Sequence, residues 1–178
     1  QIKEGIHLAY CTNIHRGEGW QETFQGLKEY SLKVKDKVSN TDPFAIGLRL
    51  GYKAAIELSE EGSGRLDQFI KWLDDNNCYV FTINGFPYGQ FHGARVKEQV
   101  YRPDWTSNSR LEYTNLLFNI LSKILPDGMS GSVSTLPGSF KEFITNEEEQ
   151  GEMIVNNLGR CGHYINQLCE KNGKDLHL

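Results

Sequence analysis

Apolar residues along this chain gather in short runs with the composition of β-strands, separated by longer amphipathic segments. The runs cover residues 6–12 (IHLAYCT), 44–50 (FAIGLRL), 78–84 (CYVFTIN) and, more weakly, 130–136 (SGSVSTL). Runs rich in β-branched and aromatic residues favour strands. The last four residues, Asp175 to Leu178, look like the opening of a fifth strand.

The segments between these runs repeat apolar residues every three or four positions, the spacing of one helix face. Four helical regions are predicted: 19–38, 54–73 with an interruption at Gly62 and Gly64, 108–125, and a last one from the acidic run 147–149 to Asn172. Ser107 or Asn108 is suited to cap the third region. Asn172 and Gly173 are typical of a helix end.

Alternating strands and helices predict right-handed crossovers and parallel strands, an α/β fold built from (β/α) units. Strand starts near 6, 44, 78, 131 and 175 give a repeat of about 42 residues, and eight such units make a (β/α)8 barrel. We therefore expect residues 1–178 to form one domain, the N-terminal half of a TIM barrel, with the C-terminal half absent.

An open, doubly wound sheet of five strands is the competing fold. No GxGxxG follows the first strand, so no nucleotide cofactor is expected. A half-barrel leaves one sheet face and two strand edges exposed. It therefore predicts that the missing half of the barrel, or a homo-oligomer, covers them.

The composition limits which kinds of partner and which cellular compartment we expect. The net charge of −4 gives no reason to expect nucleic acid, and no apolar run reaches the roughly 20 residues that a bilayer requires. The four cysteines are not spaced as a zinc site or as a disulfide framework. We expect reduced thiols, a cytoplasmic protein without membrane insertion, and a small-molecule ligand.

Two connections that leave strands, 85–106 and 137–146, are long, whereas those that enter strands are short. In α/β proteins the loops beyond the carboxyl ends of the strands carry the site. His92, in the first long loop, and His15 and Glu18, after the first strand, are candidate catalytic acids or bases. The alternatives are a solvated loop histidine at 92 and a glutamate that favours a helix start at 18.

Five further residues are candidates for binding substrate. Arg49 ends an apolar strand and pairs either with a core carboxylate or with a substrate anion. Asn84 ends the third strand and either orients a ligand or closes a turn. Arg95 and Arg102 make the long loop basic, and Ser134 ends the fourth strand. Together they favour a polar, anionic metabolite.

Several segments carry a family resemblance: HLAYCTNIHRGEGWQETF, PFAIGLRL, VFTINGFPYGQFHG, VYRPDW and VSTLPGSF. The chain resembles the EboE family of metabolite-traffic proteins, which are TIM barrels similar to xylose isomerases and sugar-phosphate isomerase/epimerases. The resemblance spans nearly the whole chain and implies a bacterial protein that moves or matures a small secondary metabolite.

The resemblance also implies a divalent metal (Mn, Mg, Co or Zn) and an isomerase or epimerase reaction. In the similar enzymes most metal ligands and the catalytic carboxylates lie on later strands, so the metal ligands in this half are unknown. A rival interpretation is a non-catalytic metabolite-binding or carrier protein that uses the same pocket.

Overall fold

The computed structural model describes residues 5–39, 41–86, 88–89 and 97–178, and it contains five parallel strands in one sheet. The strands are β1 (Ala9–Cys11), β2 (Phe44–Arg49), β3 (Cys78–Asn84), β4 (Ser130–Ser134) and β5 (Asp175–His177). All five predicted strands are therefore present, with β1 shorter than the run that predicted it.

Helices connect the strands. They are α1 (Trp20–Gly26), α2 (Leu32–Val38), α3 (Tyr52–Ser59), α4 (Arg65–Asp75), α5 (Asn108–Ile124) and α6 (Glu147–Asn172). A π-helical stretch, η2 (Leu27–Ser31), joins α1 to α2, and 3-10 turns are η1 (Thr12–Ile14), η3 (Lys97–Tyr101) and η4 (Lys141–Phe143). The Ser107 side chain caps α5 as predicted, accepting a bond from the Ser109 amide.

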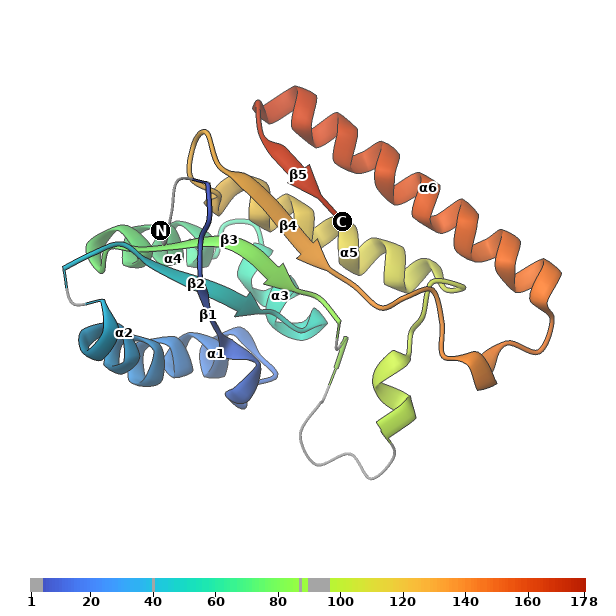
Figure 1. The fold of residues 1–178 in the computed structure, drawn as a ribbon, viewed down its shortest axis with the longest axis horizontal. Coiled ribbons are helices and arrows are strands. Elements are labelled where there is room, and N and C mark those ends of the chain that lie inside the picture. The colour runs from blue at the N-terminus through green and yellow to red at the C-terminus, as the bar shows by residue number, and fades with distance from the viewer. Residues whose placement is uncertain (1–4, 40, 87, 90–96) are drawn as a thin grey trace.

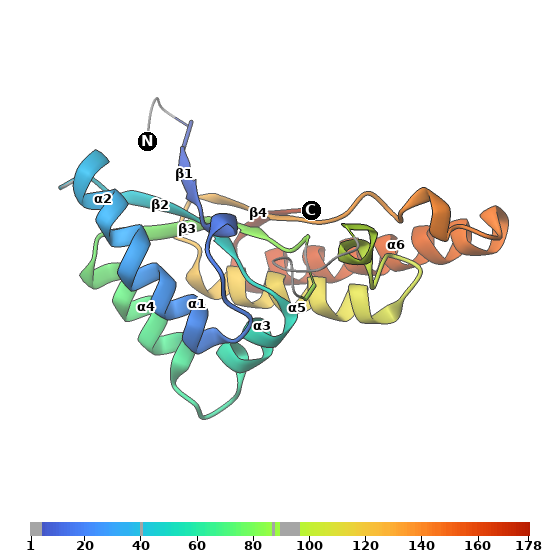
Figure 2. The ribbon, with the colours of Figure 1, turned by 90° about the horizontal axis from the view of Figure 1, so that it is seen from below.

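The strand order is β1-β2-β3-β4-β5, without a reversal. A doubly wound sheet reverses its strand order at a switch point, so this order selects the other predicted fold, a series of (β/α) units wound as in half of a barrel. Figures 1 and 2 show that the helices lie on one side of the sheet. Among the described residues, no helix covers the opposite side, which we call the open face.

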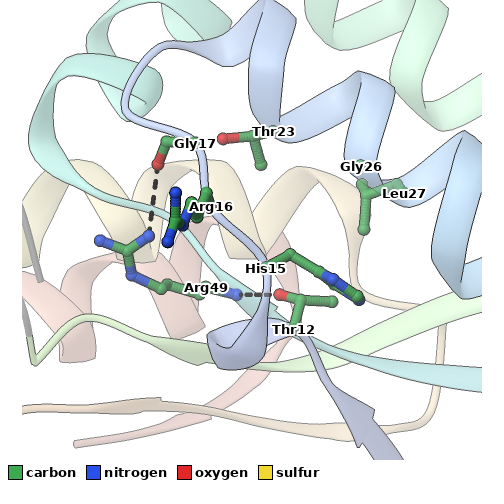
Figure 3. Close-up of a pocket in the computed structure, with 8 residues that line it drawn as sticks. All are labelled: Thr12, His15, Arg16, Gly17, Thr23, Gly26, Leu27 and Arg49. Carbon is green, nitrogen blue, oxygen red and sulfur yellow. Dashed lines mark hydrogen bonds between the residues drawn. The ribbon is translucent and has the colours of Figure 1, made fainter. Parts of the chain in front are cut away.

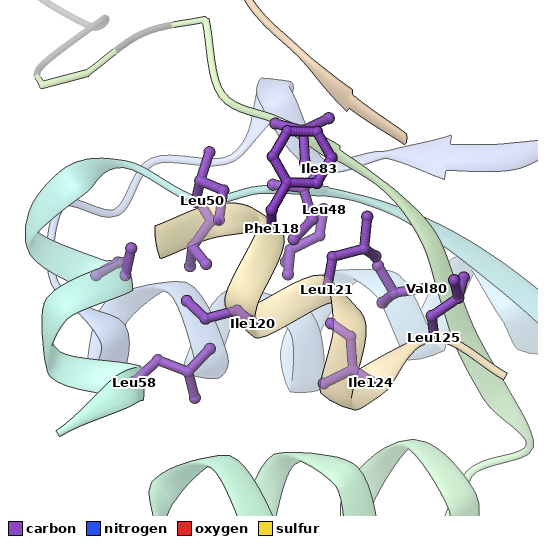
Figure 4. Close-up of a cluster of buried hydrophobic side chains, with 14 of the residues drawn as sticks. Leu48, Leu50, Leu58, Val80, Ile83, Phe118, Ile120, Leu121, Ile124 and Leu125 are labelled. Carbon is purple, nitrogen blue, oxygen red and sulfur yellow. The ribbon is translucent and has the colours of Figure 1, made fainter. Parts of the chain in front are cut away.

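The core lies between the sheet and the helices. Ile46, Leu48 and Ile83 are fully buried there, and Val133 is 1% exposed. Figure 4 shows Leu48 and Ile83 beside Phe118 of α5, which is also fully buried. No described helix is long and apolar enough to cross a membrane.

Side chains of a strand alternate between its two faces, so the residues next to these core residues along each strand point to the open face. Cross-strand pairing aligns Arg49 with Asn84 and Asn84 with Ser134 at the carboxyl ends of β2, β3 and β4. We call these three residues the rim row. An extra residue in β3, opposite the stretch between Ala45 and Gly47, sets this register.

Candidate functional site

The rim row brings together three of the predicted substrate-binding residues. Arg49, Asn84 and Ser134 come from neighbouring strands, and each immediately follows a buried core residue. The carboxyl ends of parallel strands are where α/β proteins hold their ligands. The row therefore has the position and the hydrogen-bonding groups of a binding site for a polar molecule.

Arg49 is the most unusual member of the row because it is only 8% exposed. Its two terminal nitrogens donate to the carbonyls of Gly17 and Gly89, each at 3.2 Å. Its buried Nε has no hydrogen-bond partner among the described residues. Burial lowers the pKa of Arg49, and the nearby Tyr113 phenol and Glu18 carboxylate oppose this shift.

No described carboxylate lies within 4.0 Å of the Arg49 guanidinium. Burying a cation with incomplete pairing costs free energy, and both carbonyl contacts are at the long end of the hydrogen-bond range. The sequence left two alternatives for Arg49, pairing with a core carboxylate or with a substrate anion. The first is not seen among the described residues.

Arg49 and the loop after β1 enclose a small cavity (Figure 3). The Thr12 hydroxyl fixes the strand end there, because it accepts from the Arg49 amide at 2.8 Å and donates to the Gly47 carbonyl. The cavity volume is about 10 Å³, which is close to what one water molecule needs. A metabolite would lie above the strand ends, outside this cavity.

Asn84 partly closes a turn, as one alternative predicted. Its Oδ1 accepts from the Phe86 amide at 3.0 Å, which leaves the side-chain amide nitrogen without a partner among the described residues. Gly85 follows, and a Cβ there would lie 2.5 Å from Leu117 Cδ1 and 3.1 Å from the Ser134 carbonyl oxygen. Glycine is required for this close approach, which keeps β3 and β4 together at the rim.

His15 lies beyond β1 but points away from Arg49 (Figure 3). Its ring stacks on Tyr30 at a centroid distance of 4.8 Å, and its Nε2 is 2.9 Å from the Tyr10 hydroxyl. Burial lowers the pKa of His15. The structure therefore places this imidazole against η2 and outside the rim row.

The Glu18 carboxylate opposes the lowering of the Arg49 pKa. Its amide donates to Glu22 Oε2 at 2.9 Å, at the start of α1. Arg102 is exposed and lies over the Phe143 ring, with its guanidinium carbon 4.1 Å from the centroid. His92 and Arg95 lie outside the described residues and stay predictions.

Arg110, a buried arginine on α5, was not predicted. It is fully buried and donates to the carbonyls of Pro103, Gly85 and Phe86. These bonds tie both ends of the long loop after β3 to α5. The sequence signal was a charged residue on the apolar face of that helix, which needs a buried partner.

A larger groove lies at the other end of the sheet. Its volume is about 1030 Å³, and residues at the starts of β1, β2 and β3, among them Leu8, Phe44 and Tyr79, line it together with Val38. Leu8 is 72% exposed and Val38 70%. The groove lies opposite the predicted site and contains none of the predicted site residues.

Within residues 5–39, 41–86, 88–89 and 97–178, no group of three or more His, Cys, Asp or Glu side chains could hold a metal ion. The divalent metal that the family resemblance implies stays a prediction, since the resemblance places most of its ligands on later strands. Comparison with protein-family models, curated proteins and solved structures found no match to the chain.

Proposed function

We propose that this protein binds a small, anionic, polar metabolite at the rim row. Arg49 supplies the positive charge, and Asn84 and Ser134 supply neutral hydrogen-bonding groups. The resemblance to metabolite-traffic proteins supports the same class of ligand. The proposal thus unites three residues that sequence reasoning selected separately.

The incomplete pairing of the Arg49 guanidinium carries the proposal. A guanidinium presents a planar fork of donors that matches a carboxylate or phosphate. An anion that replaces one of the long carbonyl contacts would form a charge-assisted bond in a site of low polarity, where such bonds are strong. Binding would therefore recover part of the free energy that burying Arg49 costs.

The ligand class can be tested by calorimetric titration with fructose 6-phosphate and with unphosphorylated fructose. Loss of a hydrogen bond to a charged group costs about 1.5–3 kcal/mol. We therefore expect Arg49→Gln to raise the Kd for the phosphorylated sugar by roughly 10- to 150-fold. The unphosphorylated sugar should bind more weakly than the phosphorylated one to the unsubstituted protein.

Arg160→Gln is the matched control, because Arg160 is an exposed arginine on α6 whose guanidinium donates to the side-chain oxygens of Asn108 and Asn157. Its Kd should equal that of the unsubstituted protein. An equal loss of affinity in both variants would mean a nonspecific charge effect. Unchanged affinity in Arg49→Gln would remove Arg49 from the site.

A further inference from the structure

One edge of the Arg49 guanidinium is only half used. The Nε–H and the terminal nitrogen Nη2 lie on the same edge of this planar group, and that edge can bind a carboxylate or phosphate with two parallel hydrogen bonds. Nη2 donates to the Gly89 carbonyl at 3.2 Å, whereas the buried Nε has no partner among the described residues. A single carbonyl oxygen therefore stands where an anion with two oxygens would fit.

The two carbonyls that contact Arg49 differ in how firmly they are held. Gly17, which accepts from Nη1, is packed against α1, and a Cβ there would lie 3.1 Å from the Thr23 amide nitrogen (Figure 3). Gly89 is exposed, and a Cβ there would meet no described atom within 4 Å. The Gly89 carbonyl is therefore the contact that has room to move.

Tyr88 holds this carbonyl in place, and we call Tyr88 and Gly89 together the strap. The Tyr88 ring stacks on Tyr52 at a centroid distance of 4.6 Å and makes a T-shaped contact with Tyr113 at 5.0 Å. Its carbonyl accepts from the Tyr52 amide, at the start of α3, at 2.8 Å. Burial, followed by the neighbouring Tyr52, raises the pKa of the Tyr88 phenol to about 12. The strap is thus docked on the protein.

The surface below the strap is fixed. Tyr113 is fully buried on α5, and its hydroxyl donates to the Leu50 carbonyl at 2.5 Å, directly after Arg49. Because Arg49 Nε is buried, an anion can reach it only if a neighbouring segment moves. The strap is the segment that combines an exposed residue with a contact on the required edge of the guanidinium.

We propose that the strap is an internal competitor of the ligand. In the free protein the Gly89 carbonyl occupies the Nε–Nη2 edge of Arg49, and an anion displaces it on binding. The inference rests on the proposed anion site and adds a form of regulation to it. It also accounts for the unpartnered Nε, which is the donor that the second oxygen of a carboxylate or phosphate takes.

The affinity for an anion then depends on how tightly the strap is held. A protein that binds only in its strap-released form has an affinity reduced by the fraction of molecules in that form. Weakening the strap without changing Arg49 should therefore strengthen binding. Loss of a residue that merely contacts the ligand has the opposite effect, so the direction of the change separates the two roles of Tyr88.

Calorimetric titration of Tyr88→Ala with fructose 6-phosphate provides the first test. Loss of an aromatic stack should lower the Kd by roughly 2- to 12-fold. Tyr30→Ala is the matched control, because the Tyr30 ring stacks at a similar distance, 4.8 Å, on His15, which points away from Arg49 (Figure 3). Its Kd should equal that of the unsubstituted protein.

Hydrogen exchange of the unsubstituted protein provides the second test and needs no variant. The Tyr52 amide loses its acceptor when the strap leaves, so its exchange should become faster by about fivefold or more on binding. The Ala55 amide is the internal control, since it donates to the Gly51 carbonyl at 2.9 Å in the same helix. Its exchange should not become faster.

Each outcome decides between the strap and the anion site. A Kd that is unchanged or higher in Tyr88→Ala, or a Tyr52 amide that exchanges no faster in the bound state, would overturn the strap and leave the anion site standing. Binding to Tyr88→Ala but not to the unsubstituted protein would support both. Absence of binding to either protein would remove the anion site and the role of the strap with it.

Discussion

The two faces of the sheet differ sharply although the same strands build them. The side toward the helices is filled by large apolar side chains such as Leu48, Ile83 and Phe118, all fully buried. The open face carries hydroxyls, an amide and an imidazole, for instance Thr82 and Ser134. Barrel interiors are usually packed with branched apolar residues, so this small, polar face suits a ligand better than a packed core.

Neighbouring residues of β3 allow the sharpest test of this contrast. Ile83→Ala removes a fully buried side chain and should lower the free energy of unfolding by about 2–5 kcal/mol. Thr82→Ala loses one hydrogen bond on the open face and should cost at most about 1.5 kcal/mol. Urea denaturation of both variants measures the difference, and equal costs would mean that both faces are packed alike.

Arg49 and Arg110, both buried, give a second comparison. Arg110 bonds three loop carbonyls, so Arg110→Met would leave buried acceptors unsatisfied and should cost about 3 kcal/mol. Arg49→Met replaces an incompletely paired cation and should change stability by less than about 1 kcal/mol. Thermal melts of the two variants check this order. A larger loss in Arg49→Met would make Arg49 a structural residue.

The stacked His15 gives the smallest expected effect. Burial lowers its folded-state pKa below the ordinary 6.5, so the unfolded chain binds its proton more readily. Its contribution to stability is therefore complete above pH 6.5 and is lost as the pH falls through the folded-state pKa. His15→Phe keeps the ring stack and should flatten the pH dependence of the melting temperature in that window, and an unchanged pH dependence would contradict this role of His15.

Much of the fold was predictable because the spacing of apolar residues along the chain depends only on the local sequence. Strands at 44–50 and 78–84, the Ser107 cap and the strand at Asp175 all agree with the structure. The π-helical stretch η2 was not predicted, since the apolar spacing of 19–38 fits an uninterrupted helix. The sheet order, which separates the two predicted folds, depends on long-range pairing.

The site was predictable only in part. Arg49, Asn84 and Ser134 end strands, and parallel strands bring such residues to one edge without further information. Arg110 was missed because its partners are backbone carbonyls at both ends of the loop after β3, which only the folded chain brings to α5. The exact register of the rim row was not predictable either, since it depends on the extra residue in β3.

The central claim is that an anion binds at Arg49, and the arginine Nε–H signals of the two buried arginines test it most directly. Arg49 Nε has no partner in the part of the chain that the structure describes, whereas Arg110 Nε already donates to the Pro103 carbonyl at 2.8 Å. On addition of fructose 6-phosphate, the Arg49 signal should shift and exchange more slowly with water, while the Arg110 signal stays in place. A saturating ligand that leaves the Arg49 signal unmoved would contradict the account.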